Sequence, residues 1–223
     1  MRVVILAGSD PAVESARWRN HMGVPRHLAP IDGEPILYHT VRQLDGHDIY
    51  VVGPDDDRYR IPGTTLFIPT ITPSNLWADP LLHNRSLRDP DGRTVVLCGD
   101  TWFSDDGMSR ILNYNEREWR FFCRFGASKM TGCLWGDIWG HSFWPEHVER
   151  HDDRLRYVMD LFTSKVISRN GFWEHYRAMA GATGRDVDCH RNLGMVTEID
   201  DWTEDFDFAE DYDKYIARRA ELL

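Results

Sequence analysis

Short apolar runs that end in turn-forming residues recur through the first half of the chain and restrict its fold more than any other feature. The runs are continuous rather than alternating, so the strands that they predict should be covered on both faces. Amphipathic segments such as Pro35–Leu44 lie between them, and strands that alternate with helices are typical of an α/β protein with a mostly parallel sheet. The four predicted strands are Arg2–Leu6, Ile49–Val52, Thr65–Ile68 and Thr94–Cys98.

The second half of the 223-residue chain has a different pattern, with aromatic strands followed by several helices. No linker separates the halves, so we expect one domain over residues 1–223, with a first half at 1–115 and a second at 116–223. A helix is also predicted at Asp105–Tyr114, capped by Ser104 or Asp105. The later predicted elements are strands at Trp119–Arg124, Thr131–Trp139 and Asn192–Ile199, two or three helices between Pro145 and Met179, and a terminal helix at Phe208–Leu223.

An excess of acidic residues limits the partners of this chain. Asp and Glu number 36 and Lys and Arg number 26, which gives a formal charge of −10. Such a surface repels polyanions, so we expect no nucleic-acid partner. The apolar runs are too short to cross a bilayer, and the four scattered cysteines form no CxxC pair, which favours reduced thiols. We therefore expect a cytoplasmic protein without a membrane partner, and the sequence leaves its oligomeric state open.

Two loops are placed where α/β proteins bind ligands. In open α/β sheets the ligand lies beyond the carboxyl ends of the strands, at the point where the strand order reverses. One such loop covers residues 7–27 after the first strand, and the other is Gly99-Asp100 after the fourth strand. The two loops would be neighbours if the first and fourth strands flank this reversal.

Three segments resemble the family of sugar-phosphate and phosphocholine nucleotidyltransferases. The first is Leu6-Ala7-Gly8, a later arginine, and the pattern P-[basic]-x-L-x-x-I-x-G-x-P-x-L from Pro25 to Leu37. The second is the apolar strand that ends in Gly99-Asp100, and the third is Glu198-Ile199-Asp200 followed by Glu210-Asp211-Tyr212. The resemblance implies a GT-A-like, doubly wound, three-layer α/β sheet. It also implies transfer of a nucleotide from an NTP to a phosphorylated small-molecule acceptor, with the nucleotide in the first half and the acceptor in the second.

The same resemblance implies roles for individual residues. Asp100 and Asp200 would hold Mg²⁺ or Mn²⁺, and carboxylate oxygens suit such hard cations. Arginines would neutralise charge at the reacting phosphorus and on the leaving pyrophosphate, and the spacing to Pro25 does not decide between Arg17 and Arg19. The catalytic candidates are Arg17, Arg19 and Arg26, and the candidates for nucleotide contact are Leu6, Ala7, Gly8, Ser9, Arg26 and Gly99.

Departures from the family pattern keep other functions open. Ser9 stands where the family has a second glycine, and Arg26 stands where it has lysine. The loop from Ser9 to Trp18 also lacks a compact glycine-rich turn. A glycosyltransferase of the same fold, with a nucleotide-sugar donor and a hydroxyl acceptor, is therefore the alternative. A nucleotide-binding module without catalytic activity is a third possibility.

Other residues have a structural interpretation beside a functional one. Arg124 or Lys129 would bind an acceptor phosphate, or both are ordinary loop charges. A wall of tryptophans would stack on a sugar or base, although core packing is the more common use of such residues. The order H-x-E-x-H at His147 and His151 matches neither the zincin motif nor its inverse, so no zinc site is expected there. The tryptophans in question are Trp135, Trp139 and Trp144.

Overall fold

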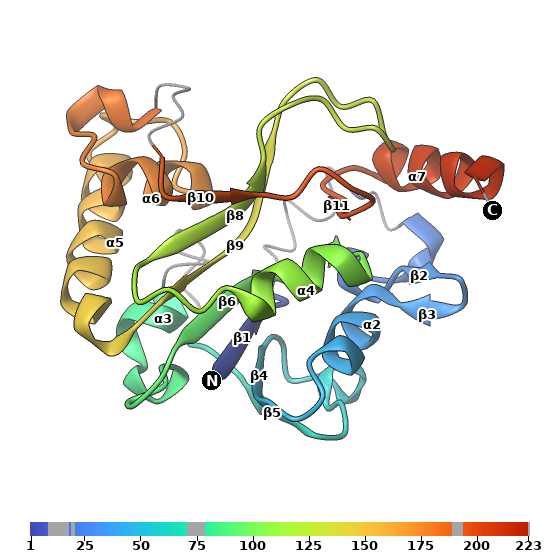
Figure 1. The fold of residues 1–223 in the computed structure, drawn as a ribbon, viewed down its shortest axis with the longest axis horizontal. Helices are drawn as coiled ribbons and strands as arrows, with labels where there is room; N and C mark the ends of the chain where they lie inside the picture. The colour runs from blue at the N-terminus through green and yellow to red at the C-terminus, as the bar shows by residue number, and fades with distance from the viewer. Residues whose placement is uncertain (9–17, 19–20, 71–78, 189–193, 223) are drawn as a thin grey trace.

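A seven-stranded sheet forms the centre of the computed structural model, which describes residues 1–8, 18, 21–70, 79–188 and 194–222 (Figure 1). The strand order is β10-β8-β9-β6-β1-β4-β5. β1 pairs in parallel with β4 and β6, β4 with β5, and β8 with β10, whereas β9 runs antiparallel to β6 and β8. The sheet is therefore mostly parallel, as predicted. Its strands are β1 (Arg2–Leu6), β4 (Asp48–Val52), β5 (Thr64–Phe67), β6 (Thr94–Cys98), β8 (Arg120–Arg124), β9 (Asp137–Phe143) and β10 (Val196–Glu198).

Helices cover both faces of this sheet and complete a three-layer α/β/α arrangement. On one face Val3 packs in the same cluster as Leu37 of α2 and residues of α4, and on the other Val4 packs with Leu155 of α5 and residues of α6. Successive side chains of a strand point to opposite faces, so the continuous run of β1 contributes to both cores. The doubly wound α/β fold is thus confirmed. The helices are α2 (Ile36–Gln43), α3 (Asp79–His83), α4 (Asp105–Asn113), α5 (Val148–Thr163), α6 (Phe172–Met179) and α7 (Ala209–Leu222), with short 3-10 turns η1 (His21–Gly23), η2 (Arg26–Leu28), η3 (Asp57–Tyr59), η4 (Arg85–Leu87), η5 (Pro145–His147) and η6 (Gly184–Asp188).

Two short antiparallel strand pairs lie outside the main sheet. β2 (Pro30–Ile31) pairs with β3 (Glu34–Pro35), and β7 (Thr101–Trp102) pairs with β11 (Glu204–Asp205). The second pair places Asp205 opposite Thr101, which follows the end of β6. Phe206 then packs in one buried cluster with Trp102 and with Tyr212 of α7. A segment near the end of the chain is thereby joined to the loop after β6.

The limits of β9 differ from the sequence prediction. The aromatic pattern placed this strand at Thr131–Trp139, whereas it begins at Asp137 and ends at Phe143. Trp135 lies before the strand with an exposed fraction of 67%. Gly140 allows β9 to lie against β6, because a Cβ at this position would collide with the carbonyl oxygen of Val96. The aromatic residues therefore indicate a strand here but not where it begins and ends.

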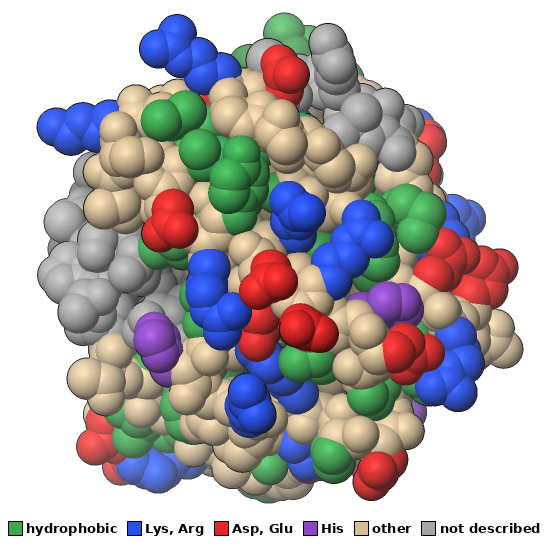
Figure 2. Space-filling model, turned by 90° about the vertical axis from the view of Figure 1, so that its left-hand side faces the viewer, with side chains coloured by type: hydrophobic (Ala, Val, Ile, Leu, Met, Phe, Trp, Pro, Cys, Tyr) green, Lys and Arg blue, Asp and Glu red, His purple; other side chains and the backbone are tan. Residues whose placement is uncertain are grey.

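The surface that α5 contributes carries both signs of charge. Figure 2 shows acidic and basic side chains intermixed on this side of the molecule. His151 and Leu155 of α5 are buried on the inner side, as expected of an amphipathic helix. Within the described parts of the chain, no helix has the length and apolar character needed to span a membrane. The cytoplasmic location and the division into two functional halves stay predictions.

Candidate active site

A pocket of about 300 Å³ opens at the carboxyl ends of the parallel strands. Leu6, Val52 and Cys98, which are the last residues of β1, β4 and β6, line it together with Asp137 and Ile138 at the start of β9. β9 begins at this edge because it runs antiparallel to β6. Ligands of open α/β sheets bind at this edge, so the pocket is the candidate ligand-binding site.

Backbone contacts hold the ends of β1 and β6 together beneath the pocket. The amide of Gly99 donates a hydrogen bond to the carbonyl oxygen of Leu6 at 2.9 Å. A Cβ on Gly99 would lie 2.8 Å from that oxygen and 2.9 Å from Ala7 Cα, so glycine is required there by packing. Leu6 and Gly8 line the pocket, and Ala7 is fully buried between them. Four residues that the sequence analysis assigned to nucleotide contact are therefore gathered at this edge.

Arg26 reaches the pocket from η2 and contacts two of its carboxylates. Its Nε lies 3.0 Å from Asp100 Oδ2, and its Nη1 lies 2.6 Å from Asp207 Oδ1. The guanidinium of the predicted phosphate-binding residue is thus held beside the predicted metal-binding residue. The other candidates from the first loop, Ser9, Arg17 and Arg19, lie outside the described residues.

Four carboxylates line the pocket: Asp100, Asp137, Asp205 and Asp207. Burial raises the pKa of Asp100 and of Asp205, and it raises the pKa of Asp137 to about 7. Asp137, Glu204 and Asp205 each offer an oxygen atom within 4.8 Å of the others. A divalent cation would relieve the cost of charging these groups, and clustered carboxylate oxygens are the ligands that Mg²⁺ and Mn²⁺ prefer. The donor set therefore fits such an ion.

The pairing of β7 with β11 explains how residues so distant in sequence meet in this pocket. Asp100 directly precedes β7, and Asp205 lies on β11 opposite Thr101. The sequence analysis did not single out Asp205 or Asp207, because the carboxylates of an acidic run such as that from 198 to 207 are most often solvated surface. The signal that could have found them is Phe206, a fully buried aromatic residue between the two aspartates.

The predicted second metal ligand, Asp200, is not among the described residues that line the pocket. Its Oδ2 lies 2.6 Å from Lys129 Nζ, and its side chain is half exposed. The neighbouring Asp201 supports the start of α4, since its Oδ2 accepts a hydrogen bond from Ser104 Oγ at 2.7 Å. Ser104 Oγ in turn accepts from the amide of Gly107 at 2.8 Å, which is the predicted helix cap.

Arg124 lies in the interior rather than on an open loop. Its Nη1 is 2.9 Å from Glu204 Oε2, and its Nη2 is 2.8 Å from Asp137 Oδ2. The residue is almost fully buried and so is Glu204. Arg124 therefore holds two acids at the back of the pocket and is not presented to an acceptor phosphate.

An aromatic wall at the start of α6 closes one side of the pocket. Phe172 and Trp173 form it, and the sequence analysis did not single out either of them. The tryptophans that it did single out lie elsewhere: Trp139 is buried in the core, Trp135 is exposed, and Trp144 donates from Nε1 to a backbone carbonyl at 2.9 Å. For Trp139 the core interpretation holds.

Comparisons with known proteins show what the chain resembles. No protein-family model and no curated protein sequence matches it. Among solved structures, a protein assigned as a glucose-1-phosphate thymidylyltransferase from Bacillus anthracis has a TM-score of 0.62 and 16% identity, over 97% of this chain and 94% of that one. An inositol-1-phosphate CTP transferase from T. maritima has a TM-score of 0.56 and 11% identity, over 99% and 96%. A 4-diphosphocytidyl-2C-methyl-D-erythritol synthase from Anaerococcus prevotii has a TM-score of 0.54 and 10% identity, over 99% and 97%. The chain therefore has the α/β fold of these nucleotidyltransferases along nearly its whole length.

Proposed function

We propose that this chain is a nucleotidyltransferase, which moves a nucleotide from an NTP to a phosphorylated small-molecule acceptor and releases pyrophosphate. The observation that carries the proposal is the ion pair between Arg26 and the partly buried Asp100, in a pocket at the ligand-binding edge of the sheet. The fold supports it, because structures of the same fold include a CTP transferase and a protein assigned as a thymidylyltransferase. The resemblance of the Leu6–Gly8, Pro25–Leu37 and Gly99-Asp100 segments supports it independently.

Asp100 and Asp205 are the residues that would hold Mg²⁺ or Mn²⁺, with Asp137 beside them. Asp205 is preferred over Asp200 because Asp205 lines the pocket, whereas Asp200 pairs with Lys129. When bound, the ion would supply positive charge that offsets the negative charge of the nucleotide's phosphates.

The remaining residues would position the nucleotide for in-line attack. A phosphate oxygen of the acceptor forms a bond to the α-phosphorus while the bond from that phosphorus to pyrophosphate breaks. Arg26 neutralises the charge that moves onto the leaving group, and it must exchange a carboxylate for a phosphate to do so. The proposed nucleotide contacts are Leu6, Gly8, Ser9 and Arg26, with the buried Ala7 and Gly99 supporting them from beneath, and Arg17 or Arg19 supplies a further positive charge.

The charges of the pocket make nucleotide binding depend on a divalent ion. Four aspartates line the pocket with a single described arginine, so the bare site repels a triphosphate. Calorimetric titration of NTPs should therefore show binding with Mg²⁺ and at least about tenfold weaker binding in EDTA. Equal affinity in both conditions would contradict the proposed role of the carboxylates.

Pyrophosphate release is the direct test of the reaction. The protein is incubated with each NTP, Mg²⁺ and a panel of sugar phosphates and phosphorylated alcohols, and pyrophosphate is measured. Asp100→Asn should lower the rate at least about 100-fold, because it removes a carboxylate that would hold the divalent ion. Asp106→Asn, on the exposed face of α4, is the matched control and should leave the rate unchanged.

A glycosyltransferase is the second candidate, and the departures in the first loop favour it. Ser9 in place of glycine and the acidic residues of that loop are less suited to a triphosphate than to a nucleotide-sugar diphosphate. The products separate the two activities. Release of a nucleoside diphosphate from a nucleotide sugar, without pyrophosphate release from any NTP, would favour glycosyl transfer.

A further inference from the structure

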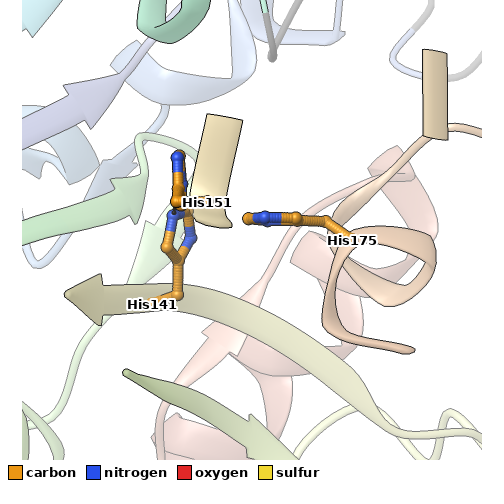
Figure 3. Close-up of side chains that lie close together, drawn as sticks. All are labelled: His141, His151 and His175. Atoms are coloured by element: carbon orange, nitrogen blue, oxygen red, sulfur yellow. Dashed lines mark hydrogen bonds between the residues drawn. The ribbon is translucent and has the colours of Figure 1, made fainter. Parts of the chain in front are cut away.

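Three histidines from three different elements meet between the sheet and the helices α5 and α6. His141 comes from β9, His151 from α5 and His175 from α6, and all three are almost completely buried. Figure 3 shows the rings of His141 and His151 close together, with the ring of His175 directed toward them from the other side. Each residue offers one ligand atom, and these atoms lie within 4.8 Å of one another.

The geometry of the first pair is close to that of two ligands on one metal ion. His141 Nε2 and His151 Nε2 are 3.0 Å apart. Two nitrogens bound tetrahedrally to zinc at its usual bond length would be about 3.3 Å apart. The plane of the His175 ring is nearly perpendicular to those of His141 and His151, at 81° and 86°. The third ring therefore presents an edge, where its nitrogens are, rather than a stacking face.

A carboxylate behind His151 favours the same arrangement. His151 Nδ1 faces Asp152 Oδ1 at 3.5 Å, and the other oxygen of Asp152 accepts from Arg88 Nη1 at 2.8 Å. A carboxylate on the outer nitrogen of a histidine orients the ring and leaves Nε2 as the electron-pair donor. Arg88 and Asp152 are themselves buried, so this support is built into the core.

The surroundings of the three rings are largely apolar, and burial lowers the pKa of all three imidazoles. Phe121 stacks on His141 and Phe143 stacks on His151, which excludes water from the cluster. Imidazole nitrogen is a common ligand of Zn²⁺ in proteins.

We propose that His141, His151 and His175 bind one Zn²⁺ ion, which joins β9, α5 and α6. The ligands come from three packed elements, so we expect the ion to stabilise the fold, and three histidines leave one position of a tetrahedral zinc without a protein ligand. The ligand atoms lie within 4.8 Å of one another, so the rings must move closer together to bind one ion. The inference is independent of the proposed transfer reaction, which uses the acidic pocket and hard oxygen ligands.

Metal analysis of the wild-type protein tests the proposal without any mutation. Protein expressed with zinc in the medium and purified without a histidine tag should contain about one zinc per chain. X-ray absorption should show nitrogen neighbours at about 2.0–2.1 Å with the outer scattering of imidazole, and no sulfur at 2.3 Å. A zinc content below about 0.1 per chain, or a shell of oxygen or sulfur without imidazole, would overturn the proposal.

Variants locate the ion and separate it from the pocket. His151→Gln and His175→Gln should each lose the zinc. His147→Gln should keep it, since His147 directly precedes α5 but is outside the cluster. Asp205→Asn should also keep the zinc, because that residue belongs to the acidic pocket. Loss of zinc in the Asp205 variant but not in the His175 variant would place the ion in the pocket and refute the histidine site.

Refolding supplies an independent readout. Wild-type protein refolded with excess Zn²⁺ should melt about 5–10 °C higher than protein refolded in EDTA, because the ion binds the folded state alone. The His151→Gln and His175→Gln proteins, where they fold, should melt at the same temperature in both conditions. An identical Tm for the wild type with and without zinc would contradict the proposal.

Discussion

The acidic pocket and the histidine cluster both include a residue of β9, and burial shifts the pKa values of these two residues in opposite directions. Asp137 begins β9 and faces the pocket, and His141 lies farther along the same strand in the aromatic interior. Burial raises the pKa of the carboxyl and lowers the pKa of the imidazole, so both are driven toward their neutral forms. The pocket also has arginine partners for its charges, whereas the histidines are packed against phenylalanines.

This difference indicates how each region would take up a cation. The pocket offers oxygen atoms and partial access to solvent, which suits an ion that arrives with a nucleotide and leaves with the product. The cluster offers enclosed nitrogen atoms, which suits an ion that enters during folding and stays. Stability, its pH dependence and ligand binding should each distinguish the two regions.

Removal of Arg124 should have the largest effect, because it leaves Asp137 and Glu204 without their buried cation. Arg124→Met should lower the free energy of unfolding by about 3–5 kcal/mol in urea. Arg117→Met is the matched control, since the Arg117–Glu146 pair is exposed, and it should change stability by less than about 1 kcal/mol. Equal effects of both substitutions would show that the pocket acids do not depend on Arg124.

The two regions should make opposite contributions to stability as pH changes in metal-free protein. The pKa of Asp137 is raised from 3.8 to about 7 in the folded state, with Arg124 opposing the shift and Glu204, Asp207 and Asp211 reinforcing it. The folded protein therefore binds the extra proton between these values, and the free energy of unfolding falls as pH rises through this range. The histidines have the opposite sign, because a lowered pKa removes stability as pH falls below about 6.5.

Asp137→Asn should expose this opposition. Urea unfolding in EDTA is measured at about pH 5 and about pH 8 for the wild type and for the variant. Because the variant keeps the histidine contribution and loses that of the carboxyl, its stability should gain about 2–3 kcal/mol more than the wild type between these values. If the two proteins show the same pH dependence, Asp137 does not titrate in the window that its burial implies.

Substitution of Trp173 should have the smallest effect and tests the boundary between the regions. Trp173 lines the pocket and lies two residues before His175 on α6. Trp173→Ala should weaken nucleotide binding about 2–10-fold in Mg²⁺, through loss of stacking, and should keep the zinc. Trp135→Ala, at an exposed tryptophan that is one of the three singled out from the sequence, should leave nucleotide affinity unchanged. If Trp135→Ala weakened nucleotide binding and Trp173→Ala did not, the base would stack on Trp135 instead.

The fold and one side of the candidate site could be predicted from the sequence, because local patterns determine them. The strands β1, β4 and β6 are continuous apolar runs, and Gly99-Asp100 marks the end of a strand whose close packing requires glycine. The cap of α4 at Ser104 follows from its residue type alone. Features of this kind depend on neighbours within a few residues.

The other side depends on contacts that no local pattern reports. Asp205 enters the pocket through a two-residue strand pair, and an acidic run is most often solvated surface. The histidine cluster was missed for a related reason. The spacing of His147 and His151 drew attention to one helix, whereas the partners of His151 lie on β9 and α6. Tertiary packing determines both groupings.

The β7–β11 pair also determines when the carboxylate site can form during synthesis of the chain. Asp100 is made early, but Asp205 and Asp207 reach the pocket only when the strand beside Thr101 has formed. A nascent chain that has left the ribosome as far as α6 already contains six of the seven strands of the sheet and all three histidines. Its carboxylate site is still half assembled at that stage. The carboxylate site is therefore completed only after most of the scaffold has been made.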